Sequence, residues 1–267
     1  MEFQLNPSGC RQVIQEYDIV RGYGPQLAAA RGEFGRTGSL VDTELNRSGV
    51  VKKSVFDSGE CDEANARFVD GICEKFDRSL AVRLLDRIFS TDIDSDIISY
   101  FGSEYFPIAA GFTEAQPGDS PTESDRWHCD AGPSNHLIMA VYFTDSEADG
   151  ANTLFIDRKS TSDLKSAGYV YCDIHDRVSN IEDLTDELGM ERPEISTLPV
   201  KAGDVIVFDA PNILHRRSMP KLAARHVMFV AITPSILSWR EVVGHGTFPL
   251  PLEAQDPFLH LPGYAQE

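Results

Sequence analysis

Apolar residues recur every three or four positions along residues 57–90, a spacing that predicts one long amphipathic helix. Its apolar stripe consists of Val69, Ile72, Cys73, Phe76, Leu80, Leu84 and Ile88. We expect this helix to pack on a sheet and to carry no chemistry. Residues 1–56 contain too many glycines for long helices, although a short helix over residues 11–20 fits the pattern.

From about residue 100 the pattern changes to short β-rich runs separated by Gly, Pro, Asp or Asn. Eight strands are predicted, at residues 105–112, 126–130, 136–144, 153–156, 168–172, 204–209, 215–218 and 226–233. A parallel α/β sheet would need helices between its strands, and residues 204–233 leave no room for one. We therefore expect a mainly β fold with helical N-terminal support, namely a double-stranded β-helix, the cupin-like jelly roll.

These elements predict one structural domain with three regions. Residues 1–99 form a helical and irregular N-terminal support, residues 100–234 the jelly-roll catalytic core, and residues 235–267 a C-terminal extension. Within the core, residues 145–194 form an acidic insertion with 13 acidic and 5 basic residues, and a short helix is expected at residues 181–190. This insertion is interpreted either as a plain solvated surface or as a lid that closes over a substrate.

The charge of the chain disfavours several classes of partner. The 267 residues include 42 Asp or Glu and 24 Lys or Arg, for a formal net charge of −18. Such a charge repels phosphate backbones and anionic headgroups, so neither nucleic acid nor a membrane surface is an expected partner. No apolar run approaches the ~18 residues of a membrane span, and the N-terminus lacks a signal-peptide layout. The five scattered cysteines are typical of thiols in a reducing compartment, so a cytoplasmic location is expected.

The segment Arg126-Trp127-His128-Cys129-Asp130 carries the strongest chemical signal. On a strand, His128 and Asp130 project to the same side and can bind one metal ion together. His215, after the turn Ala210-Pro211-Asn212, is the best candidate for a third ligand. Two histidines and one carboxylate leave three octahedral positions open, which suits non-haem Fe(II) and oxygen chemistry. Taken alone, a His-x-Asp pair is weak, and a core histidine beside a surface aspartate is the alternative.

The surroundings of His215 strengthen this interpretation. The stretch Lys201-Ala202-Gly203-Asp204 precedes an apolar strand, and Arg225 opens another strand ten residues beyond His215. An arginine on a strand next to the metal is suited to pair with a dicarboxylate bound to that metal, because its planar fork matches a carboxylate.

This combined pattern resembles the Fe(II)/2-oxoglutarate-dependent dioxygenases, most closely the phytanoyl-CoA-hydroxylase-like and prolyl-hydroxylase-like branches. The resemblance covers residues 100–234, and residues 150–156 resemble the Gly-Gly-Thr-Leu strand of the family with Ala151-Asn152 inserted or substituted. It implies that His128, Asp130 and His215 bind iron and that Arg225 binds the distal carboxylate of 2-oxoglutarate.

The resemblance also implies a reaction. O2 and 2-oxoglutarate are consumed, succinate and CO2 are released, and an unactivated C–H bond of a small, carboxylate-bearing metabolite is hydroxylated; ascorbate is a candidate supporting reductant. Desaturation and ring formation are variants of this chemistry. Two other classes remain as alternatives: a non-catalytic jelly-roll binding protein and a cupin-type metal-dependent hydrolase or isomerase.

Further residues near the proposed site are assigned more weakly. Arg217 shares a face of its strand with His215 and is a candidate to hold an anionic group of the substrate. A solvated surface position is the alternative. Trp127 and Tyr142 are candidates to line the substrate pocket, although aromatic residues on strands are more often core residues. His226 should point away from the site, because it follows Arg225 on the same strand.

Overall fold

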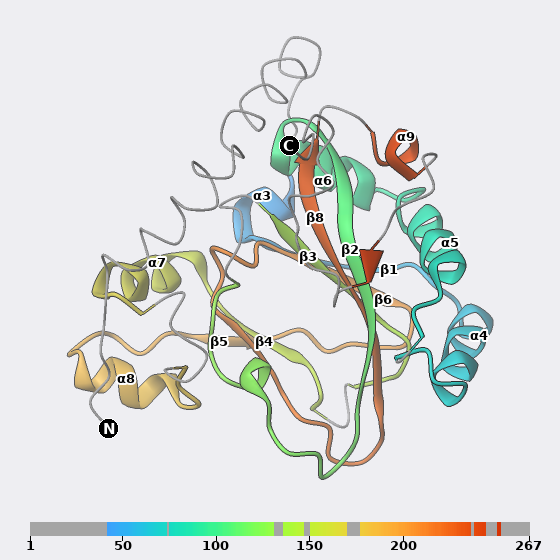
Figure 1. Cartoon of the computed structure of the whole chain (residues 1–267). Helices are drawn as coiled ribbons and strands as arrows, with labels where there is room; N and C mark the ends of the chain where they lie inside the picture. The colour runs from blue at the N-terminus through green and yellow to red at the C-terminus, as the bar shows by residue number, and fades with distance from the viewer. Residues whose placement is uncertain are drawn as a thin grey trace, which may run out of the picture.

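The computed structural model of the chain describes residues 42–73, 75–130, 136–146, 150–169, 177–235, 238–243 and 250–251. Its strands form two sheets (Figure 1). The larger sheet has the strand order β1-β6-β3-β8-β2-β9, and the smaller sheet has the order β5-β4-β7. Neighbouring strands are antiparallel except for β2 and β9, which are parallel.

The successive strands β5, β6, β7 and β8 alternate between the two sheets, as strands of a jelly roll do. The strand bounds are Val50–Ser54 (β1), Glu104–Ala115 (β2), Leu137–Tyr142 (β3), Thr153–Ile156 (β4), Ile195–Thr197 (β5), Asp204–Phe208 (β6), His215–Arg217 (β7), Arg225–Ser235 (β8) and Leu250–Pro251 (β9).

Helices lie beside both sheets (Figure 1). Those near the larger sheet are α3 (Glu44–Ser48), α4 (Ser58–Val69), α5 (Arg78–Ile88), α6 (Ile93–Phe101) and α9 (Trp239–Val243). Those near the smaller sheet are α7 (Arg158–Ala167) and α8 (Ile181–Glu187), and a short 3-10 turn, η2, covers Glu123–Asp125. Within the described part of the chain, no helix has the length and apolar character needed to cross a membrane.

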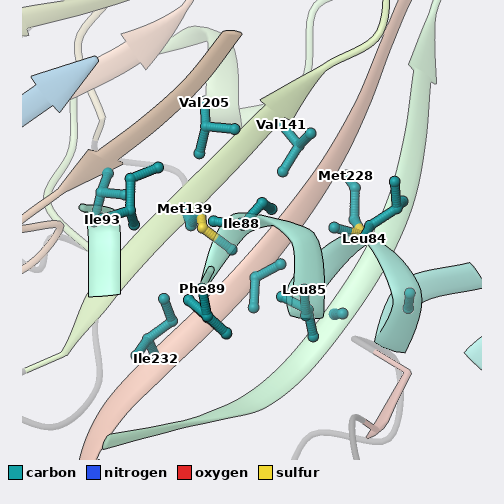
Figure 2. Close-up of a cluster of buried hydrophobic side chains, with 14 of the residues drawn as sticks. Leu84, Leu85, Ile88, Phe89, Ile93, Met139, Val141, Val205, Met228 and Ile232 are labelled. Atoms are coloured by element: carbon teal, nitrogen blue, oxygen red, sulfur yellow. The ribbon is translucent and has the colours of Figure 1, made fainter. Parts of the chain in front are cut away.

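The two faces of the larger sheet belong to two different hydrophobic clusters, because side chains alternate along each strand. On the outer face, residues of β3, β6 and β8 pack against α5 and α6 in one cluster. Figure 2 shows this contact between Leu84, Leu85, Ile88, Phe89 and Ile93 of the helical layer and Met139, Val141, Val205, Met228 and Ile232 of the sheet. Burial of these side chains fixes the helical layer to the back of the barrel.

The inner face of the larger sheet turns toward the smaller sheet. Its buried residues form what we call the inner cluster: Ala140, Tyr142, Phe155, Val200, Ile206, Phe208, Ala210, Ile213 and Val227. The rings of Phe155 on β4 and Phe208 on β6 lie 5.3 Å apart between their centroids. The two sheets therefore face each other across a shared apolar layer.

A third group of buried residues, which we call the lateral cluster, lies under α7 and α8. It consists of Trp127, Cys129, Ile156, Leu164, Tyr169, Val178, Ile181, Leu184 and Leu214. These residues come from the predicted insertion and from two segments of the predicted core. Within residues 145–194, β4 is a strand of the smaller sheet that pairs with both β5 and β7.

The single long helix predicted over residues 57–90 is wrong, because the structure has two helices there. Asp70 ends α4, Gly71 adopts a left-handed conformation with φ 80°, and Asp77 starts α5 by accepting a hydrogen bond from the Leu80 amide at 3.0 Å. Val69, assigned to the apolar stripe, is 87% exposed. The residues that end the first helix and begin the second can be recognised in the sequence. The prediction ignored them because the apolar spacing continues across them.

Most predicted strands are confirmed, and two are corrected. Strands β2, β3, β4, β6, β7 and β8 occupy the predicted positions. Residues 126–130 are extended but form only one isolated bridge, so a full strand was wrong there. Gly168 is the left-handed cap of α7 with φ 100°, so no strand begins at residue 168, and residues 170–172 lie outside the described residues. The predicted helix at residues 11–20 also lies outside them.

Three elements important for the site were not predicted. Strand β1 falls in the stretch expected to be irregular, and it pairs with β6. Strand β5 has three residues, all exposed, so it shows no apolar alternation. Helix α7 has the sequence RKSTSDLKSA and buries only Thr161 and Leu164, which leaves it without an apolar stripe to detect.

Gly203, in the predicted Gly-Asp turn, should be one of the least replaceable residues of the fold. It has φ 93°, and a Cβ atom there would lie 2.2 Å from the Phe56 carbonyl oxygen. Gly203→Ala should therefore lower the free energy of unfolding by about 2–5 kcal/mol, the sum of left-handed strain and overpacking. Denaturant titration measures this change.

Gly189→Ala is the matched control for that experiment. Gly189 also has positive φ, 63°, but a Cβ atom there would meet nothing within 4 Å. Its replacement by alanine should lower the free energy of unfolding only by the left-handed strain, about 1–2 kcal/mol. Equal losses in the two variants would show that the contact with Phe56 is unimportant.

Candidate metal centre

His128 and His215 are joined by two backbone hydrogen bonds. The His128 amide donates to the His215 carbonyl at 3.0 Å, and the His215 amide donates to the His128 carbonyl at 2.9 Å. The centroids of their imidazole rings lie 4.4 Å apart. The Asp130 amide is held in turn by the Ala210 carbonyl at 3.0 Å. The three residues predicted to bind a metal are thus brought together by the backbone.

The side chains of residues 127–130 alternate as an extended segment requires. Trp127 and Cys129 point into the lateral cluster, whereas His128 and Asp130 point to the opposite side, where His215 lies. Trp127 is 1% exposed, and its ring carries the Arg216 guanidinium 5.4 Å from the ring centroid. Trp127 is thus a core residue of the lateral cluster, and its role in lining the substrate pocket stays a prediction.

The three side chains have the spacing of a metal-binding triad. The Asp130 Oδ1 atom lies 3.4 Å from His128 Nε2 and 3.6 Å from His215 Nε2. One ligand atom from each residue falls within 4.8 Å of the others, and no other such group occurs among the residues searched, which are the described ones. Neighbouring ligand atoms around an ion with bonds of about 2.1 Å lie about 3 Å apart. The triad therefore fits a divalent ion after small side-chain movements.

Each histidine is oriented by a carbonyl group two residues before it. His128 Nδ1 lies 2.7 Å from the Arg126 carbonyl oxygen, and His215 Nδ1 lies 2.9 Å from the Ile213 carbonyl oxygen. Because a carbonyl can only accept, Nδ1 carries the proton in both rings and Nε2 keeps its lone pair. This tautomer directs both Nε2 atoms toward Asp130, as metal ligation requires.

The electrostatic environment favours the ligand forms of these groups. Burial lowers the pKa of His128, and the neighbouring His215 lowers it further, so the imidazole stays neutral. Burial raises the pKa of Asp130, but hydrogen bonds and charge from the two imidazoles, in the form that carries a proton on Nε2, outweigh that effect and hold the pKa well below the usual range of a carboxyl. A metal ion would take the place of those protons. A neutral imidazole and an ionised carboxylate are the forms that bind metals.

Arg225 presents a positive charge that the described part of the chain does not neutralise. The residue is 3% exposed, and its Nε and Nη1 atoms have no hydrogen-bond partner among the described residues. Its guanidinium lies 5.4 Å from the ring centroid of Tyr142 and 5.8 Å from that of Phe229. Burial lowers the pKa of Arg225 accordingly. A buried, unpaired guanidinium is costly, and an anion that binds from outside would remove the cost.

Tyr142 lies beside Arg225 at the boundary between the two sheets. Its hydroxyl is 2.9 Å from the Thr153 hydroxyl on β4. Hydrogen bonding with Tyr142 favours the charged form of Arg225 and opposes the effect of burial on its pKa. The structure therefore associates Tyr142 with the buried arginine.

Arg217 is already paired, unlike Arg225. Its Nε and Nη2 atoms contact the two carboxylate oxygens of Asp125 at 2.7 and 2.8 Å, and Nη2 also contacts the Thr122 hydroxyl at 3.0 Å. Burial raises the pKa of Asp125, but the hydrogen bonds from Arg217 and Thr122 lower it overall. This bidentate pair engages the guanidinium of Arg217, and its role in holding an anionic group of the substrate stays a prediction.

His226 lies on the outer face of β8, as expected. Its ring stacks on Phe68 with 4.1 Å between centroids, and its Nδ1 atom lies 2.9 Å from the Asn65 side-chain oxygen. Because side chains alternate along β8, Arg225 points inward and His226 outward.

The sequence analysis missed a cavity at the turn that precedes His215. The cavity has a volume of about 580 Å³ and is lined by Asn46, Tyr100, Arg158, Ser162, Lys165, Asp209 and Asn212. Asp209 and Asn212 belong to the turn whose Ala210 and Ile213 carbonyls hold Asp130 and His215. The remaining lining comes from helices on both sides of this turn, and only the turn itself was recognisable in the sequence.

Comparisons with known proteins identify the fold. No family model and no curated protein matches the chain. Two solved structures of EctD from S. alaskensis are similar: the form with bound Fe has a TM-score of 0.53 at 13% identity, over 86% of this chain and 87% of that chain. The form with 2-oxoglutarate and 5-hydroxyectoine has a TM-score of 0.51 at 12% identity, over 74% and 78%. The predicted fold class, a double-stranded β-helix or jelly roll, is confirmed.

We expect the triad to bind one divalent ion. Titration with Co(II), a spectroscopically visible substitute for Fe(II), should show one site in the wild-type protein and no measurable site in His128→Ala or His215→Ala. Two remaining ligands are too few to retain the ion. His226→Ala removes an imidazole from the opposite face of β8 and should bind Co(II) like the wild type. Wild-type affinity in His215→Ala would contradict the assignment.

Proposed function

We propose that this protein is an Fe(II)/2-oxoglutarate-dependent oxygenase that hydroxylates an unactivated C–H bond of a small, carboxylate-bearing metabolite, with release of succinate and CO2. The observation that carries the proposal is the unpaired guanidinium of Arg225. It lies on the inner face of a jelly roll that also holds a His-Asp-His triad. Neither a simple binding protein nor a metal-dependent hydrolase needs a buried cation in addition to such a triad.

In this proposal His128, Asp130 and His215 hold the ferrous ion from one side. Three ligands leave the remaining octahedral positions for exogenous groups. The bound ion, 2-oxoglutarate and O2 together supply the oxidising chemistry. The related halogenases have a small residue in place of the carboxylate ligand, which leaves room for chloride. Asp130 fills that position here, so hydroxylation is the outcome we propose, with desaturation and ring formation as variants.

Arg225 would bind the distal carboxylate of 2-oxoglutarate through its planar fork. Its Nη1 atom, which has no partner among the described residues, can form this fork together with Nη2 of the same guanidinium. The Tyr142 and Thr153 hydroxyls lie beside the same position and can help to orient the anion.

Aromatic residues of the inner cluster would protect the metal site from water. The ring of Phe208 lies 4.8 Å from that of His215, and Phe155 packs against Phe208. An apolar wall next to the ligands strengthens electrostatic contacts and limits side reactions with water.

The cationic side chains near the site are mostly engaged. Arg216 and Arg217 contact Trp127 and Asp125. In the cavity beside the turn at residues 209–213, Arg158 pairs with Asp209 at 2.9 Å, and Lys165 Nζ donates to the Pro211 carbonyl at 2.8 Å. The proposal of a carboxylate-bearing substrate therefore rests on the sequence argument. The −18 charge continues to favour a small-molecule partner over nucleic acid or a membrane, and the five scattered cysteines continue to favour a cytoplasmic location.

Conversion of 2-oxoglutarate to succinate tests the proposed class directly. Under air, the protein loaded with Fe(II) should convert 2-oxoglutarate to succinate at a measurable rate, and addition of the correct substrate should raise that rate. Succinate is quantified by NMR, with anaerobic and Co(II)-loaded samples as controls. Absence of succinate from the Fe(II)-loaded protein, across a panel of small carboxylic acids, would contradict the proposal.

Arg225→Ala should weaken the binding of 2-oxoglutarate to the metal-loaded protein. Loss of a charge-assisted bidentate pair costs roughly 2–5 kcal/mol, which corresponds to a roughly 30- to 4,000-fold lower affinity. Anaerobic titration of the Fe(II)-loaded protein measures the affinity. Arg225→Lys should recover part of the loss, since the charge returns without the fork.

Arg217→Ala is the discriminating comparison for this titration. Asp125 already satisfies the Arg217 guanidinium, so its removal should change the affinity far less than removal of Arg225 does. The reverse order of the two variants would move the anchor to Arg217. Wild-type affinity in both would remove the main support for 2-oxoglutarate as cosubstrate.

A further inference from the structure

Two buried hydroxyl groups lie next to the two metal-binding histidines in the same structural arrangement. They belong to Thr161 in α7 and to Tyr169, which directly follows the helix cap Gly168. Thr161 is 0% exposed and Tyr169 is 2% exposed. Neither residue contributes to the chemistry proposed above, and α7 was not predicted from the sequence.

Thr161 is inserted into the pairing between β4 and the residue before His215. The Ile156 amide donates directly to the Leu214 carbonyl at 2.9 Å. The return bond of an antiparallel pair would run from the Leu214 amide to the Ile156 carbonyl. Instead, the Leu214 amide donates to Thr161 Oγ1 at 3.1 Å, and Thr161 Oγ1 donates to the Ile156 carbonyl at 3.2 Å.

Tyr169 makes the corresponding insertion next to His128. The Trp127 amide donates directly to the Val178 carbonyl at 2.9 Å. In the return direction, the Val178 amide donates to the Tyr169 hydroxyl at 2.7 Å, and that hydroxyl donates to the Trp127 carbonyl at 2.8 Å. A hydroxyl can fill such a gap because it donates and accepts at once.

The hydroxyl of Thr161 acts on the peptide group that orients His215. The Leu214 amide and the Ile213 carbonyl belong to the same planar peptide group. Thr161 holds the amide side of this group, and the carbonyl side receives the Nδ1 proton of His215 at 2.9 Å. Hydrogen bonding at the amide also polarises the carbonyl and strengthens its acceptance of that proton.

The hydroxyl of Tyr169 acts on the peptide group that places His128. The Trp127 carbonyl and the His128 amide share one plane. Tyr169 holds the carbonyl side, and the His215 carbonyl holds the amide side at 3.0 Å. Tyr169 also secures Val178, whose carbonyl binds the Trp127 amide. That amide belongs to the peptide group whose Arg126 carbonyl orients the His128 ring.

Both hydroxyls are placed by one short element. Gly168 ends α7 in the left-handed conformation, and the Tyr169 amide returns to the Leu164 carbonyl at 2.9 Å. This C-terminal cap sets the position of Tyr169 relative to the helix that carries Thr161. A displacement of α7 would therefore move the supports of both histidines together.

We propose that Thr161 and Tyr169 are positioning residues of the metal centre, which set the separation and ring orientation of His128 and His215. This inference rests on the proposed role of the triad as a metal site. Loss of either hydroxyl leaves a buried amide and a buried carbonyl unpaired, and the two backbone segments can restore a direct bond only by moving closer. Such a movement shifts the adjacent ligand.

The experiment measures Co(II) binding in the absence of 2-oxoglutarate. Thr161→Val and Tyr169→Phe each remove one hydroxyl and little volume. Each should lower the Co(II) affinity roughly 10- to 100-fold, as loss of supporting hydrogen bonds around metal ligands does. The visible d–d absorption of the Co(II) form should shift as well, because ligand geometry changes. Thr161→Ser returns the hydroxyl and should restore both affinity and spectrum.

Thr185→Val is the matched control. Thr185 is also 0% exposed, and its hydroxyl donates to the Glu182 carbonyl at 3.0 Å within α8, away from both histidine segments. Its replacement should lower the thermal midpoint about as much as Thr161→Val does and leave Co(II) affinity unchanged. A purely structural role of Thr161 would give the same result as this control.

The outcomes separate the inference from the proposed function. Wild-type Co(II) affinity and spectrum in folded Thr161→Val and Tyr169→Phe would overturn the inference, whether or not the enzyme converts 2-oxoglutarate. Selective loss of affinity in these variants would support it even if no succinate were formed. Failure of the wild-type protein to bind Co(II) would overturn both.

Discussion

The reciprocal hydrogen bonds between the backbones of His128 and His215 are the contact on which the site depends. They join a segment that precedes β3 to the first residue of β7, two parts of the chain far apart in sequence. Because this is an antiparallel pairing, residues on one face of each segment come to the same side. The two imidazoles therefore lie close together, and Asp130, two residues after His128, lies beside both.

The charges around this contact are distributed unevenly. The chain as a whole carries −18, yet the inner face of the larger sheet holds a guanidinium that no described residue neutralises. Arg217, by comparison, is neutralised within the protein, because its guanidinium contacts both carboxylate oxygens of Asp125. Arg225 differs, because its Nε and Nη1 atoms have no partner among the described residues, and this difference supports the proposal that an anion binds there.

Sequence reasoning was sufficient where local periodicity determines structure. Alternation along residues 127–130 and 225–226 correctly indicated which side chains share a face. Motif spacing identified the triad that the fold brings together. Contacts between distant segments could not be predicted. Arg217 pairs with Asp125 of η2, and Trp127 packs against residues of α7 and α8. No local pattern in the sequence specifies where these elements lie relative to the two residues. The long-helix prediction failed for a different reason. The apolar spacing continues across Asp70, Gly71 and Asp77, and the prediction relied on that spacing although these residues end one helix and begin the next.

The segment at residues 145–194 illustrates how such distant contacts shape the site. Its acidity suggested a surface insertion or a lid, but its described part supplies β4, which pairs with the strand of His215, and the helix that carries Thr161. The groups that orient the two histidine rings are backbone carbonyls, at Arg126 and Ile213, and the groups that steady those peptides are amides, carbonyls and two hydroxyls. Backbone groups are present whatever the side chain. In the proposed metal site, the histidine ligands are therefore oriented mainly by groups that every residue carries, and only the hydroxyls of Thr161 and Tyr169 require particular side chains.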